Sequence, residues 1–549
     1  MEKRLIFAFV LSSLVFILWS YINGTKPEQP LSGNEAIRQE SPAVMPESGK
    51  IQDSNLQIQD IQPVAPSDTE KDIKVETPLY QAIFTNRGAT IKSFKLKKYK
   101  TTMEPDSPLV DLINITDNSA TFLSVNFAPV GAADNNAVFY SASQESVTVS
   151  EGTSPKDLTF KYPATNGVSI DQTFRFYPDK YTIDLYVTVT NNTSAPVSGN
   201  IKTCLSDMPP QAKKSYASFV GTALLLNDSL QQIKSSKMKE GKSLSGQIGW
   251  IAYESDYFIS SIIPENQKEG GFYGLTTPSG VISATYISPT ISLGASGGAS
   301  SGYTLYFGPR DQDILKAAGK KLDSAINFGW FDIIAKPLHF LLRFFNGYVH
   351  NYGISIIILT ILVKIIFWPL THKSYVSMKE MQKLQPLMAK IREKYKDDRE
   401  QMQRELMGLY KTYKVNPMGG CLPMIIQIPI FFALYKILSI SIELRQAPFM
   451  LWITDLSAPD RLFSFPFSIP FMYPPYGIPV LTLLMGASMF LQQKMSPPAG
   501  DPAQAKMMMF MPIIFTFMFI NFQSGLVLYY LINTIIGIGQ QYRIKKRSV

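Results

Sequence analysis

One charged residue, Lys364, lies inside a largely apolar stretch at residues 353–370. An ammonium group is costly to place in hydrocarbon, so a lysine at membrane depth usually faces a partner or a water-filled cavity. The alternative is a lipid-facing lysine whose side chain extends toward the headgroups. Neither this stretch nor the later apolar stretches contain aspartate or glutamate. The sequence therefore predicts that a visiting molecule supplies the counter-charge.

Uncharged polar residues in the apolar stretches are candidates to line a hydrated pocket around Lys364. Thr360 lies one helical turn before the lysine. The other candidates belong to separate stretches and are Gln427, Tyr529, Tyr530 and Asn533. Because spacing along one chain does not bring separate helices together, their convergence is a hypothesis. Such groups would attract and hydrogen-bond a ligand without making or breaking covalent bonds.

The 549-residue chain divides into two regions of different composition. It is polar and rich in Thr, Ser and Asn up to about residue 320, and Ile, Leu, Phe and Met dominate from about residue 325. The net charge of +9 does not indicate nucleic-acid binding, because the basic residues gather beside the apolar stretches. Two cysteines in different regions and three histidines without zinc-type spacing predict neither a disulfide framework nor a metal site. We expect no cofactor.

The N-terminal segment contains Lys3 and Arg4 followed by an apolar run, residues 5–22, of roughly membrane-spanning length. A cleaved signal peptide is the alternative, but no small-x-small cleavage site follows the run. We expect an uncleaved transmembrane anchor at 1–23. Residues 24–75 are rich in Pro, Ser, Gln and Glu and are expected to form a flexible linker.

Residues 76–325 are expected to form an all-β sandwich. Between residues 181 and 190 apolar side chains alternate with polar ones, as in a strand with one buried face. Similar runs occur at 80–85, 90–96, 172–177 and 303–307, separated by turn sequences. The segment 311–325 is expected to close the domain with a short helix.

Residues 326–350 are expected to form an amphipathic helix in the outer interface of the membrane. Apolar residues at helical spacing form its predicted membrane face: Phe331, Ile334, Leu338, Leu341, Leu342 and Phe345. An ordinary, partly buried helix is the alternative.

The remaining chain alternates apolar spans with polar segments. The expected segments are spans at 351–372, 417–440, 476–494, 506–522 and 525–541, a helical hairpin at 373–415, an outer loop at 441–475 and a basic tail at 542–549. With the anchor there are six spans, five of them in a polytopic α-helical core. The positive-inside rule places the hairpin and both termini in the cytoplasm, and the sandwich on the opposite side.

The expected hairpin consists of two amphipathic helices that break near Asp397 and Asp398. Its basic face either lies against lipid headgroups or docks partners. The last three spans are short, which favours local thinning of the bilayer. Methionines gather there, either as ordinary membrane-core packing or as an adaptable apolar surface.

Three blocks of sequence, 416–423, 443–449 and 524–530, resemble the YidC/Oxa/Alb family of membrane protein insertases. The order of anchor, large domain and five-span core is similar as well. The resemblance covers essentially the whole chain and is most specific over 330–541. The chain resembles the form of this family that is found in bacteria with two membranes. This form implies an inner-membrane location and a periplasmic sandwich similar to sugar-mutarotase folds.

The resemblance implies a hydrophilic groove, open to the cytoplasm and to lipid, with its one positive charge at Lys364. The family usually has arginine there, which is always charged and offers a fixed fork of donors. The apolar part of a substrate would slide into lipid along the third and fifth spans. The candidate slide residues are Ile428, Pro429, Phe431, Met511 and Phe515. Arg392 and Asp397 are candidate docking residues of the hairpin.

The resulting hypothesis is a non-enzymatic membrane protein insertase and chaperone, acting alone or with the Sec translocon (SecYEG and SecDF). Its other partners would be nascent membrane proteins, the ribosome and the lipid bilayer, with no direct nucleic-acid partner. A polytopic transporter or channel is the alternative, but we find no internal repeat. A periplasmic sugar-acting enzyme is a third reading, but residues 76–325 contain no histidine.

Overall fold

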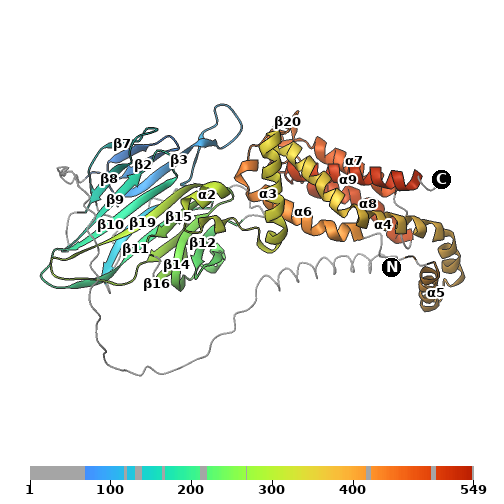
Figure 1. Cartoon of the computed structure of the whole chain (residues 1–549), viewed down its shortest axis with the longest axis horizontal. Coiled ribbons are helices and arrows are strands. Elements are labelled where there is room, and N and C mark those ends of the chain that lie inside the picture. Colours follow the sequence, from blue (N-terminus) through green and yellow to red (C-terminus); the bar gives the residue numbers. More distant parts are fainter. Residues whose placement is uncertain are drawn as a thin grey trace, which may run out of the picture. The chain divides into compact units, whose positions relative to one another are not determined.

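The computed structural model describes residues 69–115, 120–129, 139–162, 167–209, 219–266, 269–413, 415, 422–495 and 502–546 (Figure 1). The predicted anchor and most of the predicted linker lie outside these residues, as does most of the block 416–423. A large β region, followed by a helical core, makes up the described chain.

The described β region extends from strand β1 to the short helix η2. The strands are β1 (Asp72–Glu76), β2 (Tyr80–Thr85), β3 (Thr90–Lys100), β4 (Leu109–Asp111), β5 (Leu123–Pro129), β6 (Ser141–Ala142), β7 (Ser146–Thr148), β8 (Lys156–Lys161), β9 (Val168–Phe176), β10 (Thr182–Asn191), β11 (Val197–Asp207), β12 (Gly221–Leu226), β13 (Ser229–Ile233), β14 (Lys242–Glu254), β15 (Phe258–Pro264), β16 (Glu269–Thr276), β17 (Ile282–Ile287), β18 (Ile291–Leu293) and β19 (Gly298–Pro309). The short helices are η1 (Ser235–Lys237), α2 (Gln312–Ala318) and η2 (Leu322–Ala325).

Two sheets contain these strands. A five-stranded sheet has the order β4-β3-β2-β1-β7, and a fourteen-stranded sheet follows the path β18-β11-β17-β16-β14-β15-β19-β10-β9-β8-β6. Outside that path, β5 pairs with β11, and β12 pairs with β13 and β14. Figure 1 shows β9, β10, β19 and β15 side by side, and each neighbouring pair is antiparallel.

The period-two pattern of β10 builds the core of the large sheet. Ile183, Leu185, Val187 and Val189 are fully buried, and the residues between them are less so. Alternate side chains of a strand point to opposite faces, so one face of β10 lies in the core. The predicted strands at 80–85, 90–96, 172–177 and 303–307 fall on β2, β3, β9 and β19.

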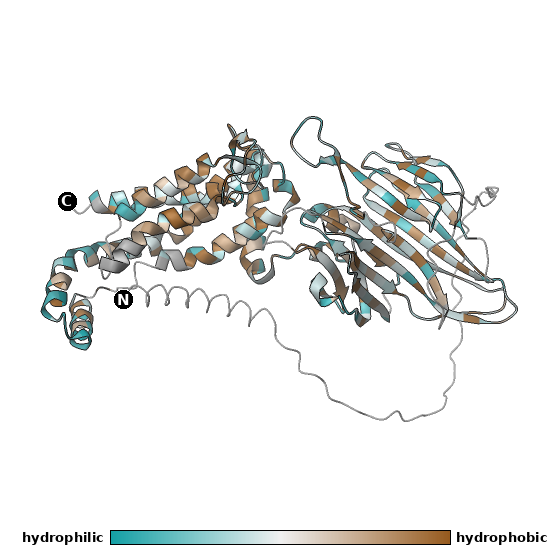
Figure 2. Cartoon of the chain, turned by 180° about the vertical axis from the view of Figure 1, so that it is seen from behind, coloured by the Kyte–Doolittle hydropathy of each residue, from teal (hydrophilic) through white to brown (hydrophobic). Residues whose placement is uncertain are grey.

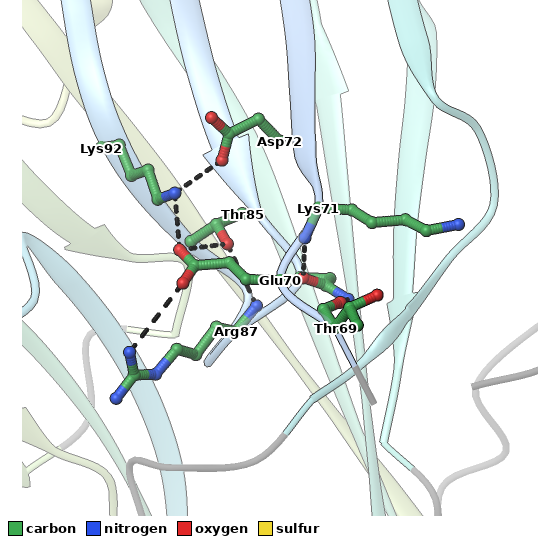
Figure 3. Close-up of polar contacts among 8 residues, drawn as sticks. Thr69, Glu70, Lys71, Asp72, Thr85, Arg87 and Lys92 are labelled. Carbon is green, nitrogen blue, oxygen red and sulfur yellow. Dashed lines mark hydrogen bonds and ion pairs between the residues drawn. The ribbon is translucent and has the colours of Figure 1, made fainter. Parts of the chain in front are cut away.

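The β region begins earlier than the sequence predicts, because β1 starts at Asp72, inside the predicted linker 24–75. Buried Ile73 and Val75 alternate with exposed neighbours, but a run with only two buried residues is too short to stand out beside the polar linker. Backbone pairing with β2 holds this first strand in its sheet, and at its start Lys92 Nζ lies 2.6 Å from an Asp72 oxygen and 2.5 Å from a Glu70 oxygen (Figure 3). The hydrogen bond from Lys92 lowers the pKa of Glu70.

Arg310 closes the β region where β19 ends. Its guanidinium is buried, and Nη2 lies 3.7 Å from Oε2 of Glu254, which is fully buried. The same Nη2 donates to the carbonyl of Ala325 at 2.7 Å, and Nη1 donates to the carbonyl of Ser255 at 3.0 Å. Burial raises the pKa of Glu254, and the Arg310 charge opposes that shift. Arg310 therefore ties β14, β19 and η2 together.

The helical core follows Ala325. Its helices are η3 (Gly329–Phe331), α3 (Asp332–Val349), α4 (Tyr352–Lys394), α5 (Arg399–Thr412), α6 (Leu422–Ile440), η5 (Ile442–Leu444), α7 (Val480–Met495), α8 (Pro502–Phe519) and α9 (Ser524–Lys546). A hairpin of β20 (Leu462–Phe465) and β21 (Tyr476–Ile478) lies between α6 and α7. Figure 2 shows mainly hydrophobic residues along α6 and α8, and hydrophilic residues gathered on α5 and the end of α4.

Helix α4 combines the predicted span 351–372 with the first arm of the predicted hairpin in one helix of 43 residues. By length and composition alone it is the one described helix apolar enough to cross a membrane. Shorter apolar helices lie at Ile426–Ile440 and Met508–Phe519. Asn351 caps the start of α4 by accepting a hydrogen bond from the backbone of Ile354 at 3.1 Å.

The prediction that this apolar face of α3 lies in the membrane interface is wrong, because the face packs on protein. Leu338 and Leu342 are buried in the helical core, and Phe331, just before α3, stacks on Phe432 of α6 with ring centres 5.4 Å apart. A second apolar face of this segment is exposed instead. Its residues are Trp330, Ile333, Phe340, Phe344 and Tyr348. Because both faces are apolar, periodicity alone does not reveal which one packs on protein.

Replacing Arg310 with methionine should destabilise the β region by about 3 kcal/mol, because Glu254 is left as a buried carboxylate without its cation. Adding Glu254→Gln should restore part of this loss, since the amide carries no charge. The measurement is the urea concentration at which the β region of the solubilised full-length chain becomes protease-sensitive. Lys316→Met, at an exposed position on α2, is the control. An unchanged midpoint for Arg310→Met would contradict the assigned role of the pair.

Candidate functional site

Lys364 lies on the face of α4 that packs against other helices. Helix α4 packs against α3, α6 and α9, and Lys364 is only 9% exposed. No ion pair or hydrogen bond joins it to another residue that the structure describes. The described core therefore holds an ammonium group within its helices and offers it no carboxylate.

Thr360 lies one turn before Lys364 and is fully buried. Its hydroxyl donates a hydrogen bond to the carbonyl of Ile356 at 2.6 Å. This local bond uses the hydroxyl proton, so Thr360 offers a visiting group only the lone pairs of its oxygen.

The structure brings Gln427 of α6 and Tyr529 of α9 together. The side chain of Gln427 lies beside the phenol of Tyr529. Its amide nitrogen Nε2 is buried and has no hydrogen-bond partner in the described part of the chain. Asn533 lies one turn beyond Tyr529 and is also largely buried. Within the ranges that the structure describes, none of these three residues forms a hydrogen bond with Lys364.

Tyr530 points into an aromatic cluster. Its ring packs edge-to-face on Phe431 of α6, with centres 5.4 Å apart, and on Phe519 of α8, with centres 5.1 Å apart. The ring of Phe431 also contacts Tyr435 and Phe519. Tyr529 and Tyr530 are adjacent on α9, yet one meets an amide and the other meets phenyl rings.

Sequence reasoning missed a second set of polar residues between α4, α7 and α9. Thr371 Oγ1 lies 3.2 Å from Oε1 of Gln540 and 3.1 Å from its Nε2. Further along, Tyr375 interacts with Gln492 and Gln541. We call Thr371, Tyr375, Gln492, Gln540 and Gln541 the polar seam. A Cβ atom at Gly537 would lie 2.6 Å from Gln492 Nε2, so glycine makes room for this contact.

A signal for the polar seam was present in the sequence. Thr360, Lys364, Thr371 and Tyr375 recur at spacings that place them on one face of a helix. The apolar stretch 353–370 ends before the second half of this pattern. The partners on α7 and α9 carry no such signal, because contacts between helices do not follow from spacing.

A second lysine, Lys436, was also missed. It lies in the apolar part of α6, close to the end of that helix at Ile440, and is half-buried. Unlike Lys364, it takes part in an interaction within the described chain. A lysine so near a helix end can extend its ammonium toward the membrane interface, so the cost of its charge is lower.

The candidate slide residues lie on α6 and α8. Ile428 is exposed, and Phe431, Met511 and Phe515 are half-buried. Pro429 lies within α6. The rings of Phe431 and Phe515 each contact Phe519, so the two helices meet through this phenylalanine. The exposed apolar side chains of α8 are Met509, Phe510, Ile513, Ile514, Phe517 and Met518.

Comparison with known proteins matches almost the entire chain to one family. The family described as 60Kd inner membrane protein matches residues 344–549, and the YidC periplasmic domain matches residues 72–341. The membrane protein insertase YidC of Syntrophus aciditrophicus is 41% identical and covers 100% of both chains. That of Pelobacter propionicus is 42% identical over 100% of this chain and 99% of its own.

The chain belongs to the YidC family of membrane protein insertases. The family resemblance predicted from the three sequence blocks is thereby confirmed. As a YidC protein, the chain is a non-enzymatic insertase of the inner membrane that binds substrate membrane proteins, and its β region is the periplasmic domain. A solved YidC insertase crystal structure with the first transmembrane domain resolved is 19% identical, with a TM-score of 0.37 over 88% of this chain and 95% of that one.

The hairpin of this YidC protein consists of the end of α4 and helix α5. Met381, Leu384 and Met388 of α4 are buried against apolar residues of α5. The turn falls at 395–398, where Asp398 caps α5 by accepting a hydrogen bond from the backbone of Gln401 at 3.0 Å. Arg392 lies near Tyr410, whose pKa burial raises. Asp397 is exposed and makes no ion pair with Arg392.

The family block 443–449 lies at the opposite end of the core, just after α6. Glu443 is largely buried, with Oε1 3.7 Å from His339 Nε2 and 3.5 Å from Arg343 Nε. Burial raises the pKa of Glu443 to about 7 and lowers the pKa of His339 to about 4. The cluster therefore holds a carboxyl that is partly protonated at neutral pH beside a neutral imidazole.

Glu443→Gln should change how the stability of the helical core depends on pH. A carboxyl whose pKa folding raises from 4.5 to about 7 stabilises the fold in its protonated form, and this contribution is lost as pH rises between those values. The variant should therefore gain up to about 3 kcal/mol relative to the unmodified chain over that range. The His339 contribution has the opposite sign, and it largely cancels because both proteins contain His339. Thermal unfolding of both proteins from pH 5 to 8 measures their difference in stability. A difference that does not change with pH would refute the assignment.

Lys364→Met should leave the helical core equally stable or more stable, because it removes a charge that no described residue neutralises and roughly keeps the length of the side chain. A gain of about 1 kcal/mol corresponds to a rise of about 2–4 °C in Tm for a unit of this size. Thermal unfolding in detergent measures the change. Lys373→Met, at an exposed position of the same helix, is the matched control. A lower Tm for Lys364→Met would mean that the protein stabilises the lysine after all.

Proposed function

We propose that Lys364, Thr360, Gln427, Tyr529, Tyr530 and Asn533 line a hydrophilic groove that receives a polar segment of a membrane protein substrate. The observation that carries this proposal is the burial of Lys364 in the core without a carboxylate among the described residues. An acidic group on the substrate would supply the missing counter-charge. The Nε2 of Gln427, which has no hydrogen-bond partner among the described residues, would donate to a backbone carbonyl or carboxylate of the same segment.

The groove would be open toward the cytoplasm and toward lipid. The polar seam supports the first opening, because it extends the polar face of α4 from Lys364 toward the hairpin. The exposed apolar side chains of α8 support the second. A substrate segment would then remain partly hydrated while its apolar neighbour meets hydrocarbon.

The apolar part of the substrate would leave along α6 and α8, past Ile428, Pro429, Phe431, Met511 and Phe515. Aromatic rings on both helices give it a continuous apolar contact. We find no nucleotide-binding loop in the sequence. Partition of apolar residues into the bilayer would drive insertion together with the membrane potential, which contributes about 2.3 kcal/mol per charge per 100 mV.

The topology that fits this route has six spans, five of them in the core, with both termini and the hairpin in the cytoplasm. The lysine and arginine residues of the hairpin and tail support this orientation. The expected domain boundaries are kept, with two changes: the β region begins at β1, inside the expected linker, and one helix, α4, links the span 351–372 to the hairpin.

The hairpin would receive partners that deliver substrates. Arg392 and Asp397 are the candidate docking residues, and the exposure of Asp397 supports this role. Nascent chains would arrive from the ribosome, and the insertase would act alone or beside the Sec translocon, SecYEG and SecDF. The basic hairpin could contact lipid headgroups whether the insertase acts alone or beside the Sec translocon.

Lys364→Glu should reduce insertion of substrates whose translocated segments are acidic, because attraction at the groove becomes repulsion. A loss of about 1.4 kcal/mol of attraction corresponds to about a tenfold loss in occupancy. Protease protection of such a substrate, in cells that depend on this insertase, measures the effect. Substrates without acidic translocated residues should be affected less.

Two matched variants make this test specific. Lys364→Arg keeps the charge and should retain insertion, whereas Lys373→Glu reverses an exposed charge on the same helix and should have little effect. Unimpaired insertion of acidic substrates by Lys364→Glu would refute the electrostatic role. Equal loss with Lys373→Glu would assign the effect to the net charge of the helix instead.

A further inference from the structure

The connection between α6 and α7 carries exposed apolar residues that the proposed groove does not use. Residues 462–478, which we call the aromatic loop, contain no Asp, Glu, Lys, Arg or His. Its most exposed large apolar side chains are Phe463 at 68%, Phe467 at 60%, Phe471 at 85% and Tyr473 at 52%. Exposed apolar groups gathered in one segment mark a site for an apolar partner.

The backbone of the aromatic loop is fixed by polar contacts at its base. Arg461 donates to the carbonyl of Pro475 at 2.9 Å and also to a carbonyl between α8 and α9. Asn521, between α8 and α9, accepts from the backbone N–H of Tyr473 at 2.8 Å and donates to the carbonyl of Phe471 at 2.7 Å. The aromatic side chains therefore project from a backbone that hydrogen bonds already fix, so binding costs little backbone entropy.

Two of the exposed phenylalanines have a left-handed backbone conformation, with φ of 59° at Phe463 and 62° at Phe471. Bulky residues rarely adopt it, and it persists where the surroundings impose it, often at binding sites. At Phe471 the surroundings include the hydrogen bond from Asn521. The loop accepts strain at two of its most exposed apolar positions.

We propose that the aromatic loop inserts its side chains into the headgroup region of the phospholipid bilayer. The chain is an inner membrane protein, and the loop is tied through Asn521 to the end of α8. The exposed apolar face of α8 reaches Phe517 and Met518, just before that connection. The loop thus continues an apolar surface already exposed along α8. Aromatic rings concentrate at the level of the headgroups, and the absence of charge permits them to enter.

The backbone of the loop argues against a polypeptide as the occupant. Pro466, Pro470, Pro474 and Pro475 lie within it and donate no backbone hydrogen bond. A peptide that docks by strand addition needs a regular series of such donors. A bilayer needs none, because it recognises the side chains alone. The insertion holds the α6–α7 and α8–α9 connections at a fixed depth, and it does not depend on the proposed groove.

Nitroxide labelling of the full-length chain tests this inference. In a Cys204→Ser, Cys421→Ser background, single cysteines replace Phe467, Phe471 or, as the water-exposed control, Met103, which is exposed in the β region. Each labelled protein is reconstituted into vesicles of phosphatidylethanolamine and phosphatidylglycerol. Accessibility to oxygen, which prefers lipid, is compared with accessibility to a water-soluble nickel chelate. Insertion activity equal to that of the cysteine-free parent shows that each labelled protein is folded.

The ratio of oxygen to nickel accessibility should be several-fold higher at positions 467 and 471 than at position 103. A ratio equal to that at position 103 places the loop in water and overturns the proposal. Low accessibility to both reagents means that the loop packs on protein, which also overturns it. A ratio that falls when the protein is diluted with lipid indicates a second copy of the chain as the occupant and overturns it equally.

Discussion

The rest of the core depends on one constraint: an ammonium group is held among apolar helices without a carboxylate from the described residues. Lys364 is largely buried, and no described residue neutralises it. Isolated charges at membrane depth require water, a partner or both. The neighbouring polar residues do not replace a counter-ion, since Thr360 spends its proton on its own helix. The core is therefore incomplete as an electrostatic unit, and a substrate carboxylate completes it under the proposed function.

The length of α4 links this charge to the hairpin. At about 1.5 Å per residue, its 43 residues extend about 65 Å, roughly twice the thickness of a hydrocarbon core. The first turn break after Lys364 comes only at 395–398, after the buried contacts of the hairpin have begun. One continuous helix therefore joins the hairpin to the residues around Lys364. The separation of span and hairpin in the sequence is a change of composition, and the backbone passes through it unbroken.

The sequence was most informative where a single element carries its own pattern. The alternation in β10 and the turn before α5 could be predicted because local residues determine them. The start of β1 could not, because two buried residues beside a polar linker make too short a pattern. Nor could the packed face of α3, since both faces of that segment are apolar. Contacts between helices, such as that of Thr371 with Gln540, depend on distances that spacing along one chain does not contain.

Helix α9 places a polar and an apolar environment next to each other. Adjacent helical residues project about 100° apart, as a turn contains about 3.6 residues. Tyr529 accordingly meets Gln427, while Tyr530 meets the rings of Phe431 and Phe519. A membrane protein substrate has the same division, between a segment that must stay hydrated and one that must reach lipid. Under the proposed function the boundary between these two segments is set by two neighbouring tyrosines on one helix. Lys364 then selects which polar segments enter, and the aromatic cluster determines where their apolar neighbours leave.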